Sequence, residues 1–409
     1  MSAAPVITGL GVVAPNGLGA EAYWAAARTG TGAIGPITRF DASGYPVRLG
    51  AEATAFVPTD HVPRNLVVQT DVWSQYALAA AAWALDDGAL APGDLSPFDI
   101  AVVTSSSSGG NAFGQRQIQH LWAESPKHVS AYQSIAWFYA ASSGQLSIRF
   151  GLKGPCGVVA SEGAGGLDAL GQARRLLRRG TSAVLCGGTE APISPYALTC
   201  HLPAGQVTTS DDPATAYRPF ASGADGYVLG EGGAVLLVED RASAERRGAA
   251  HLYAEVAGYA ATHDGRVGPP ADGTHLARAA ELALADAGIG AAGVDAVFAD
   301  AWGTEAADRA EVHALRTTFG ERLADVPVTT PKAQVGRLHS GGAALDVATA
   351  ALALHHQFLP PATTAAGAWQ TDGARLVTGD GLAMTLDNVL VLARGYGGFN
   401  AAVVLRRPR

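Results

Sequence analysis

The sequence predicts an α/β fold in which helices cover sheets, and three observations support this prediction. Short apolar runs rich in β-branched residues recur along the 409 residues, and each has the length of a buried strand. Ala- and Leu-rich segments with helical spacing lie between several of these runs. Hydrophobic residues make up 48% of the chain and charged residues only 16%, which is typical of a globular protein with a large buried core.

The apolar runs give the order of the elements. We expect strands at 5–13, 99–104, 157–161, 182–186, 233–238, 295–299, 389–392 and 401–405. We expect helices at 73–86, 166–178, 273–287 and 342–356. A charged helical segment follows the fifth strand at 241–248. We therefore divide the chain near residue 250, into an N-terminal half, 1–250, and a C-terminal half, 251–409.

Charge and cysteine content exclude several classes of function. The formal net charge is −8 and there is no long basic run, which disfavours a nucleic-acid partner. Cys156, Cys186 and Cys200 form no CxxC pair, so we expect no zinc ribbon, and their small odd number is typical of a reducing cytoplasm. No apolar run approaches the roughly 20 residues of a membrane helix, and residues 1–5 lack the features of a signal peptide. We expect a cytoplasmic protein with no membrane partner, metal or cofactor.

A turn of small residues joins the strand at 157–161 to the helix that follows. Gly163 stands at its apex, between Glu162 and Ala164. A sharp turn at a helix N-terminus suits acyl transfer, because the helix dipole and its free N–H groups lower the pKa of a thiol and stabilise an oxyanion. Glycine, however, has no side chain that could attack. The turn taken alone is equally compatible with a plain glycine-rich connection.

Five stretches extend the pattern through the chain, at 6–13, 151–155, 219–232, 332–336 and 395–400. With the turn, they resemble the β-ketoacyl synthase family of the thiolase superfamily. Within that family the chain is most similar to the chain length factors, the ketosynthase β subunits of bacterial type II polyketide synthases. This resemblance implies a thiolase-like fold, with two similar βαβ-type halves that form an αβαβα layered sandwich.

Active members of the family carry a Cys-His-His set, and the resemblance implies that this chain lacks it. The cysteine position matches Gly163, the first histidine matches Trp302, and the second histidine, which follows Val-Gly, matches Arg337. A condensing enzyme needs the thiolate to hold the acyl chain and the imidazoles to stabilise an enolate. An indole and a permanently cationic guanidinium cannot replace them. Three replacements inside matching flanks therefore predict a silent subunit.

The resemblance assigns structural roles to further residues. Chain length factors commonly carry glutamine at the apex, which has been linked to a decarboxylating, priming role. Gly163 has no amide for that role, and we expect it to leave vacant volume beneath the turn. Lys332 stands at the family's lysine position, where it supports a loop. Asp308 and Glu311 resemble the acidic positions after the first histidine motif and are expected to hold a loop instead of catalysing.

Other chemically able residues admit two interpretations. His339 is either a displaced base or a packed polar residue, and we favour the second. Glu162 is a neighbour of the apex, and its side chain is expected to point elsewhere. Cys156 and Cys186 are interpreted as buried small hydrophobic residues, not nucleophiles. Adjacent residues do not share a helix face, so the pair at 355–356 predicts a solvated helix end and no metal site.

The segment from Asn111 to Trp122 predicts a helix with three residues on one face. Asn111, Gly114 and Ile118 are spaced i, i+3 and i+7. In chain length factors the matching helix lines a tunnel at the heterodimer interface, so the resemblance makes these residues gates, together with Gln133 in the aromatic-rich stretch 130–139. Their small sizes predict an open tunnel and a long product. The alternative is an ordinary amphipathic helix in which Gly114 marks a packing contact.

The function implied by the resemblance is that of a catalytically silent chain length factor. Its expected partners are a ketosynthase α subunit that carries the active cysteine and an acyl carrier protein that delivers malonyl groups and the growing chain. Arginine pairs at 174–175 and 178–179 are candidate carrier contacts. Two alternatives remain open. One is an active condensing ketosynthase or malonyl-carrier-protein decarboxylase with atypical residues, and the other is a thiolase-fold binding protein outside polyketide synthesis.

Overall fold

The computed structural model describes residues 5–270, 272–362 and 371–409. Residues 1–4, on which the expectation of no signal peptide depends, lie outside the described residues. The main feature of the fold is a twelve-stranded mixed sheet, which runs in the order β13-β11-β10-β15-β16-β9-β1-β8-β7-β5-β6 with β2 paired to β1. Parallel neighbours within the sheet are joined through helices, as βαβ connections require. The α/β class predicted from the sequence is confirmed.

The sheet contains the same strand order twice. In each half the first strand pairs antiparallel with the last, the last pairs antiparallel with the one before it, and two parallel neighbours follow. The two sets are β1 (Pro5–Ala14), β8 (Gly232–Asp240), β7 (Ala183–Glu190), β5 (Ile100–Ser105) and β6 (Cys156–Val159), and β9 (Ala254–His263), β16 (Phe399–Arg406), β15 (Asn388–Gly395), β10 (Ala296–Phe298) and β11 (Pro327–Thr329). The halves meet where β1 pairs with β9. The division predicted near residue 250 falls between β8 and β9 and stays a prediction.

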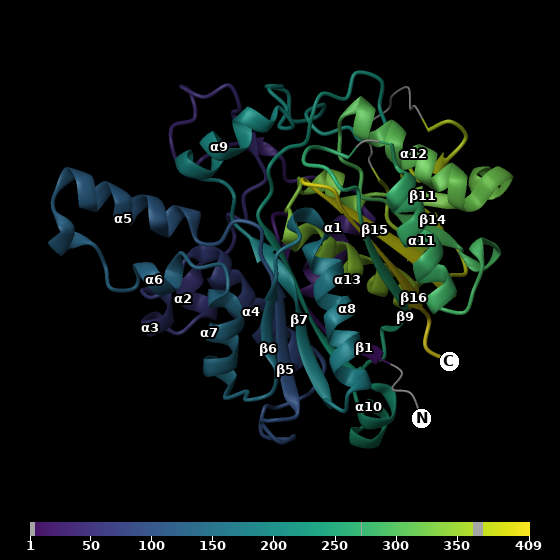
Figure 1. Ribbon diagram of the computed structural model, residues 1–409, viewed down its shortest axis with the longest axis horizontal. Coiled ribbons are helices and arrows are strands. Elements are labelled where there is room, and N and C mark those ends of the chain that lie inside the picture. Colours follow the sequence, from purple (N-terminus) through teal and green to yellow (C-terminus); the bar gives the residue numbers. More distant parts are fainter. Residues whose placement is uncertain (1–4, 271, 363–370) are drawn as a thin grey trace.

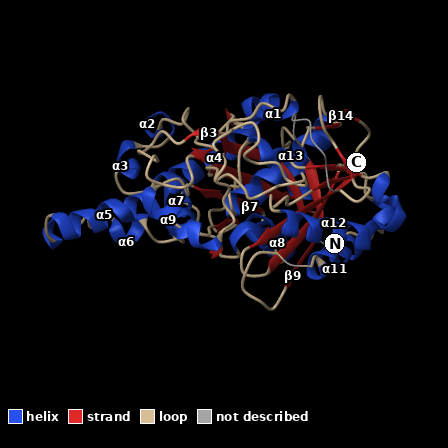
Figure 2. Ribbon diagram, turned by 90° about the horizontal axis from the view of Figure 1, so that it is seen from above, coloured by secondary structure: helices blue, strands red, loops and turns tan. Residues whose placement is uncertain are grey.

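Helices form layers on and between these strands (Figures 1 and 2). On the outside, α4 (Val72–Asp87) packs on β1 and β8, and α11 (Thr274–Asp286) packs on β9 and β16. Between the halves, α8 (Gly165–Arg178) and α13 (Ser340–His356) pack on each other. Helix α13 is buried on all sides from its first residue to Leu354, which suits its Ala- and Leu-rich, uniformly apolar sequence. This is the αβαβα layering of the thiolase-like fold.

The remaining elements are shorter or lie at the edges. They are β2 (Gly17–Leu18), β3 (Gly35–Pro36), β4 (Leu49–Gly50), β12 (Phe358–Leu359), β13 (Arg375–Leu376) and β14 (Leu382–Ala383), the helices α1 (Ala20–Arg28), α2 (Pro58–His61), α3 (Arg64–Val67), α5 (Asn111–Ala123), α6 (Gln133–Ala136), α7 (Ala141–Phe150), α9 (Pro195–His201), α10 (Arg241–Arg247) and α12 (Glu305–Phe319), and the 3-10 turns η1 (Pro126–His128), η2 (Glu162–Ala164), η3 (Leu202–Ala204), η4 (Ala291–Gly293), η5 (Gly320–Ala324) and η6 (Pro331–Gln334). Residues 111–140, with α5 and α6, form an arm that projects from one end of the molecule (Figures 1 and 2).

Each strand and helix predicted from the sequence is present within a few residues of its expected bounds. Strand β9 was missed because its run of Ala with Gly258 has weak strand propensity. Helix α12 was missed because its sequence is mostly charged and small, with few apolar residues to set a period. Among the described residues, no helix combines the length and apolarity needed to cross a membrane.

Candidate functional site

The predicted site residues come from both halves of the chain and meet where the η2 turn packs on β15, β16 and α13. Strand β6 leads into the η2 turn and α8, β10 leads to Trp302, and β11 leads through η6 to the start of α13. The carboxyl ends of parallel strands are where α/β proteins build their sites. Gly163 lies beside the guanidinium of Arg337, which in turn lies over the ring of Trp302, so the three residues share one site as the sequence predicts.

Gly163 is buried in the η2 turn, immediately before α8. A Cβ atom at this position would lie 2.4 Å from the carbonyl oxygen of Arg394 and 2.7 Å from Nη2 of Arg337. Both distances are far below van der Waals contact, so only glycine fits here without a shift of the backbone. The expectation of vacant volume beneath the turn is wrong, because the Arg337 guanidinium already occupies that space.

Arg337 is held by contacts on several sides. Its Nη2 donates to the carbonyl oxygen of Arg394 at 2.7 Å and to Asp300 Oδ1 at 3.2 Å. Its guanidinium carbon lies 4.1 Å from the ring centroid of Trp302 and 5.7 Å from that of Tyr227, a geometry that suits cation–π attraction. Arg337 and Trp302 thus contact each other, and Arg337 fills the space beside Gly163.

A buried charge network supports this arrangement. Asp300 accepts from Arg337 and from Arg394, and Arg394 also binds Glu311 at 2.8 Å. Lys332 lies 2.5 Å from Asp346 and 3.9 Å from Asp300. Burial alone would raise the pKa of Asp300, but the charges of Arg337 and Arg394 outweigh it and hold that pKa well below its usual range.

The same charges decide the protonation of Arg337. Burial would lower the pKa of its guanidinium, but Asp300 and Glu162 outweigh burial and raise that pKa above its ordinary value. A permanently charged guanidinium cannot accept a proton, so it cannot serve as a general base. Arg337 therefore contributes a fixed positive charge and no acid–base chemistry beside Gly163.

The two acidic positions after Trp302 hold the loop before α12. Glu311 accepts the backbone N–H groups of Asp300 and Ala301, and Asp308 accepts those of Gly303 and Phe220. Burial raises the pKa of Asp308 to about 7. Each of the two side chains binds a backbone N–H of the loop that carries Trp302; Asp308 also joins this loop to Phe220, and Glu311 joins it to Arg394.

Glu162 and His339 form a pair that sequence analysis did not predict. His339 Nδ1 lies 2.6 Å from Glu162 Oε1, and the N–H of Tyr396 donates to Glu162 Oε2 at 2.7 Å. Both members have φ near +47°, a strained conformation for residues other than glycine. The expectation that Glu162 points away from the site is wrong, because Tyr396 and the imidazole beside Arg337 hold its carboxylate at the turn.

The charge state of this pair follows from its surroundings. Burial would raise the pKa of Glu162, but the hydrogen bond and charge of His339, together with the charge of Arg337, lower it to about 2. An ionised carboxylate only accepts hydrogen bonds, so His339 Nδ1 donates to it. The ring of His201 stacks on His339 with centroids 4.7 Å apart, and burial lowers the pKa of His201 to about 3.

The cysteines lie away from the apex. Cys186 is buried on β7, as expected, and burial raises the pKa of its thiol. Cys156 is exposed, so the expectation that it is buried is wrong: it begins β6, the outermost strand of the sheet, whose open edge faces solvent. Cys200 is also exposed, on α9.

The adjacent histidines at 355–356 are exposed at the end of α13, as the sequence predicts. His356 stacks on Trp24 with centroids 5.1 Å apart. Across the described ranges, no group of three or more His, Cys, Asp or Glu residues is arranged to hold a metal ion.

The four predicted gate residues come together in the arm. Asn111, Gly114, Ile118 and Gln133 line one cavity of about 160 Å³, which is completed by Gln115, Trp137 and Tyr196. The sequence predicts an opening at Gly114, because this residue has no side chain. The structure shows no opening there. A Cβ atom at Gly114 would lie 2.8 Å from Cδ1 of Trp137, so the indole already fills the space above the glycine.

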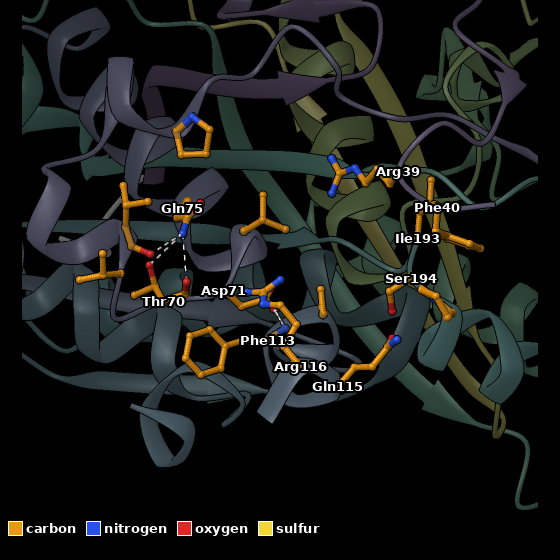
Figure 3. Close-up of a pocket in the computed structure, with 16 residues that line it drawn as sticks. Arg39, Phe40, Thr70, Asp71, Gln75, Phe113, Gln115, Arg116, Ile193 and Ser194 are labelled. Atoms are coloured by element: carbon orange, nitrogen blue, oxygen red, sulfur yellow. Dashed lines mark hydrogen bonds between the residues drawn. The ribbon is translucent and has the colours of Figure 1, made fainter. Parts of the chain in front are cut away.

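A larger hollow of about 810 Å³ is lined by Ala112, Phe113, Gln115 and Arg116 of α5, together with residues of other segments (Figure 3). Its lining combines apolar side chains, including Phe40 and Phe113, with Arg39, Arg116 and the buried Asp71. Asp71 Oδ2 accepts the N–H of Phe113 at 2.6 Å, which ties the start of α5 to the start of α4. Helix α5 therefore contributes to the walls of both hollows, and Gly163 lines neither of them.

Of the arginine pairs at the end of α8, Arg174 is buried, whereas Arg175, Arg178 and Arg179 are exposed, and their role as carrier contacts stays a prediction. Arg174 donates to the carbonyl oxygen of Ala257 and forms an ion pair with Asp286. Arg178 approaches Asp286 at 3.8 Å. Arg174 and Arg178 thus join the C-terminal end of α8 to α11, and Arg174 also joins it to β9.

Family comparison agrees with this geometry. The model of the β-ketoacyl synthase N-terminal domain matches residues 4–244, and that of the C-terminal domain matches residues 253–365. The chain belongs to the β-ketoacyl synthase family. Its membership accounts for the thiolase-like fold.

Individual relatives of this synthase-family chain match it almost end to end. It is 48% identical to the tetracenomycin polyketide synthase ketoacyl synthase beta subunit of Streptomyces glaucescens over 403 residues, covering 98% of each chain. It is 47% identical to the actinorhodin polyketide putative beta-ketoacyl synthase 2 of Streptomyces coelicolor over 406 residues, with the same coverage. Among solved structures, the ishigamide ketosynthase/chain length factor superposes with a TM-score of 0.92 over 100% of both chains, at 27% identity.

Proposed function

We propose that this chain is the catalytically silent chain length factor of a type II polyketide synthase. It pairs with a cysteine-bearing ketosynthase and lines the tunnel in which the acyl chain grows. The observation that carries the proposal is the guanidinium of Arg337, which fills the space beside Gly163 and stacks on Trp302. A substrate thioester placed at this apex would collide with a buried cation and would find no nucleophile.

The names of its relatives support the pairing. Relatives with 46–48% identity are named as ketosynthase beta subunits or second β-ketoacyl synthases of polyketide pathways, and the ishigamide structure is named as a ketosynthase/chain length factor. By analogy, an acyl carrier protein delivers malonyl groups and the growing chain to the cysteine-bearing partner.

The surface of the arm supports an association with another protein. Large apolar side chains are exposed there, including Trp122 at 82%, Trp137 at 50% and Tyr139 at 46%. Exposed apolar patches of this kind mark interaction sites. Strand β6 adds an open sheet edge, a surface that soluble proteins normally cover. We infer that the partner ketosynthase covers the arm and this edge.

The experiment that tests silence is intact-mass analysis of the purified chain after incubation with malonyl- and acyl-carrier protein. We expect no increase in mass, whereas a ketosynthase with its active cysteine, run in parallel, gains one acyl group. Stable acylation of any cysteine in this chain would overturn the proposal. Co-purification with the partner ketosynthase tests the pairing, and failure to associate would instead favour a thiolase-fold binding protein outside polyketide synthesis.

One observation favours the alternative of residual decarboxylation. The Glu162–His339 pair has the arrangement of an oriented histidine, and Nε2 of His339 is buried with no hydrogen-bond partner. Release of CO₂ from malonyl-carrier protein by the isolated chain measures this activity directly. Activity that disappears in His339→Ala would establish the alternative, whereas we expect no release above the protein-free rate.

A further inference from the structure

Three glycines at the start of the arm make room for one segment of chain. Ideal Cβ atoms on Gly109 and Gly110 would lie 2.6 Å from the carbonyl oxygen of Trp137 and 2.0 Å from that of Ala136, and one on Gly114 would lie 2.8 Å from Trp137 Cδ1. The N–H of Gly110 also donates to the Trp137 carbonyl oxygen at 3.2 Å. The backbone of Trp137 is therefore fixed against the turn before α5, and its indole is fixed against α5 itself.

Trp137 also forms part of the cavity wall. It closes the hollow of about 160 Å³ that Asn111, Gly114, Ile118 and Gln133 line. The Trp137 side chain is half exposed, so it contacts both the cavity and the solvent at the surface of the arm. The glycine at 114 and the tryptophan at 137 act as one steric unit, since a larger residue at 114 could enter only by displacing the indole.

We propose that Trp137 is the residue that limits the length of the acyl chain in this protein, with Gly114 as the seat of its indole. The inference rests on the proposed chain-length function and deepens it. Sequence spacing on α5 alone indicates an open gate at Gly114, but the structure assigns the gate to an aromatic ring from the segment after α6. The tip of a growing chain that reaches α5 meets this ring instead of an opening.

The test is the product distribution of the complete complex, with the partner ketosynthase, acyl carrier protein and a malonyl supply. Trp137→Ala removes the indole, and we expect the main product to lengthen by at least one two-carbon unit. Trp137→Phe keeps a smaller ring and should give a mixture of the two lengths. Phe138→Ala is the matched control, because Phe138 is a neighbouring exposed aromatic that does not line the cavity, and it should leave the distribution unchanged.

A second pair of variants tests the contact itself. Gly114→Ala should push the indole into the cavity and shorten the product or slow its release. In the Trp137→Ala background the same change should have no effect, because residues in direct contact give non-additive results. Additive effects would contradict the assignment of the two residues to one unit.

The outcomes separate this inference from the function on which it rests. If Ile118→Trp shortens the product but Trp137→Ala and Trp137→Phe leave it unchanged in an intact complex, the chain-length function holds and the role of Trp137 is refuted. If neither Ile118→Trp nor any Trp137 variant changes the product, the chain-length function itself fails. Should Trp137→Ala not assemble with the partner, Trp137→Phe decides the question.

Discussion

Buried cations face buried carboxylates around Gly163, whereas large apolar side chains face solvent on the arm. In the first region Asp300 and Glu311 neutralise Arg337 and Arg394 in a space with no room for a side chain at the apex. In the second region residues such as Trp122 and Ile135 are exposed and are not needed to fill a core. The residues around Gly163 are held in place by buried charges, whereas the arm keeps an exposed apolar surface, which we propose is covered by a partner.

This difference makes a general prediction about mutations. Changes around Gly163 should lower the stability of the isolated chain, because they disturb buried charges or close backbone contacts. Changes on the arm should leave that stability nearly unaltered and act on association or product length. Four predictions follow from this contrast, in order of decreasing effect on the unfolding free energy.

Asp300→Ala should have the largest effect. It leaves the buried guanidinium groups of Arg337 and Arg394 without their shared carboxylate, and breaking a buried ion pair costs about 3–5 kcal/mol. Denaturant unfolding of the isolated chain measures the loss. Asp325→Ala removes an exposed carboxylate and should change the unfolding free energy by no more than about 0.5 kcal/mol. Equal stability of the two variants would show that the charge network is not structural.

Glu162→Gln should lower stability in a pH-dependent way. The folded-state pKa of Glu162 is about 2 against an ordinary value of 4.5, so the unfolded chain binds more protons in this interval. The stability that the ionised Glu162 carboxylate contributes is therefore fully present above about pH 4.5 and is lost as the pH falls towards 2, and its upper bound is about 3 kcal/mol.

The measurement is the difference in unfolding free energy between the native protein and Glu162→Gln at pH 7, 5 and 3. The difference should be similar at pH 7 and 5 and smaller at pH 3. Glu321→Gln, at an exposed position, is the control. A difference that grows on acidification would contradict the assigned pKa.

Gly163→Ala should cost about 1–3 kcal/mol, because its methyl group enters contacts of 2.4 and 2.7 Å with Arg394 and Arg337. Gly157→Ala is a matched control in the preceding strand, where a Cβ atom would meet no atom within 4 Å. Thermal unfolding should show a lower midpoint for the first variant only. Similar midpoints would mean that the apex has room for a side chain.

Trp122→Asp should change the stability of the isolated chain by no more than about 0.5 kcal/mol, since Trp122 is 82% exposed on the arm. In the complex the same carboxylate would be desolvated against an apolar surface, so we expect at least a tenfold loss of affinity for the partner ketosynthase, on the order of 1.4 kcal/mol or more. Surface plasmon resonance or analytical ultracentrifugation measures this. Unchanged affinity would exclude this part of the arm from the interface.

The strands and helices were predictable because local patterns determine them. The uniformly apolar segment of α13 predicts a buried helix, and the β-branched run of β8 predicts a strand. The alanine-rich sequence of β9 predicts neither. The positions of Gly163, Trp302 and Arg337 were also predictable, because the family resemblance aligns them. Their proximity depends on the η2 turn of the first half, which packs on β15, β16 and α13 of the second.

Details that depend on three-dimensional packing could not be predicted. No spacing rule indicates that the side chain of Arg337 enters the space at Gly163, or that Trp137 covers Gly114, because each contact joins distant segments. The Glu162–His339 pair spans 177 residues in sequence and depends on two strained backbone conformations. The exposure of Cys156 depends on β6 being the outermost strand, which only the assembled sheet order reveals.

The middle layer of helices has a consequence for how the protein is made in the cell. Helix α8 belongs to the first half of the chain, but much of what covers it, including α13 and the Asp286 that neutralises Arg174, belongs to the second. During synthesis, the apolar face of α8 stays uncovered and Arg174 stays without its ion-pair partner until the last third of the chain has left the ribosome. Expression yield should therefore depend on chaperones that protect this nascent half, and the two halves produced separately should aggregate instead of reassembling.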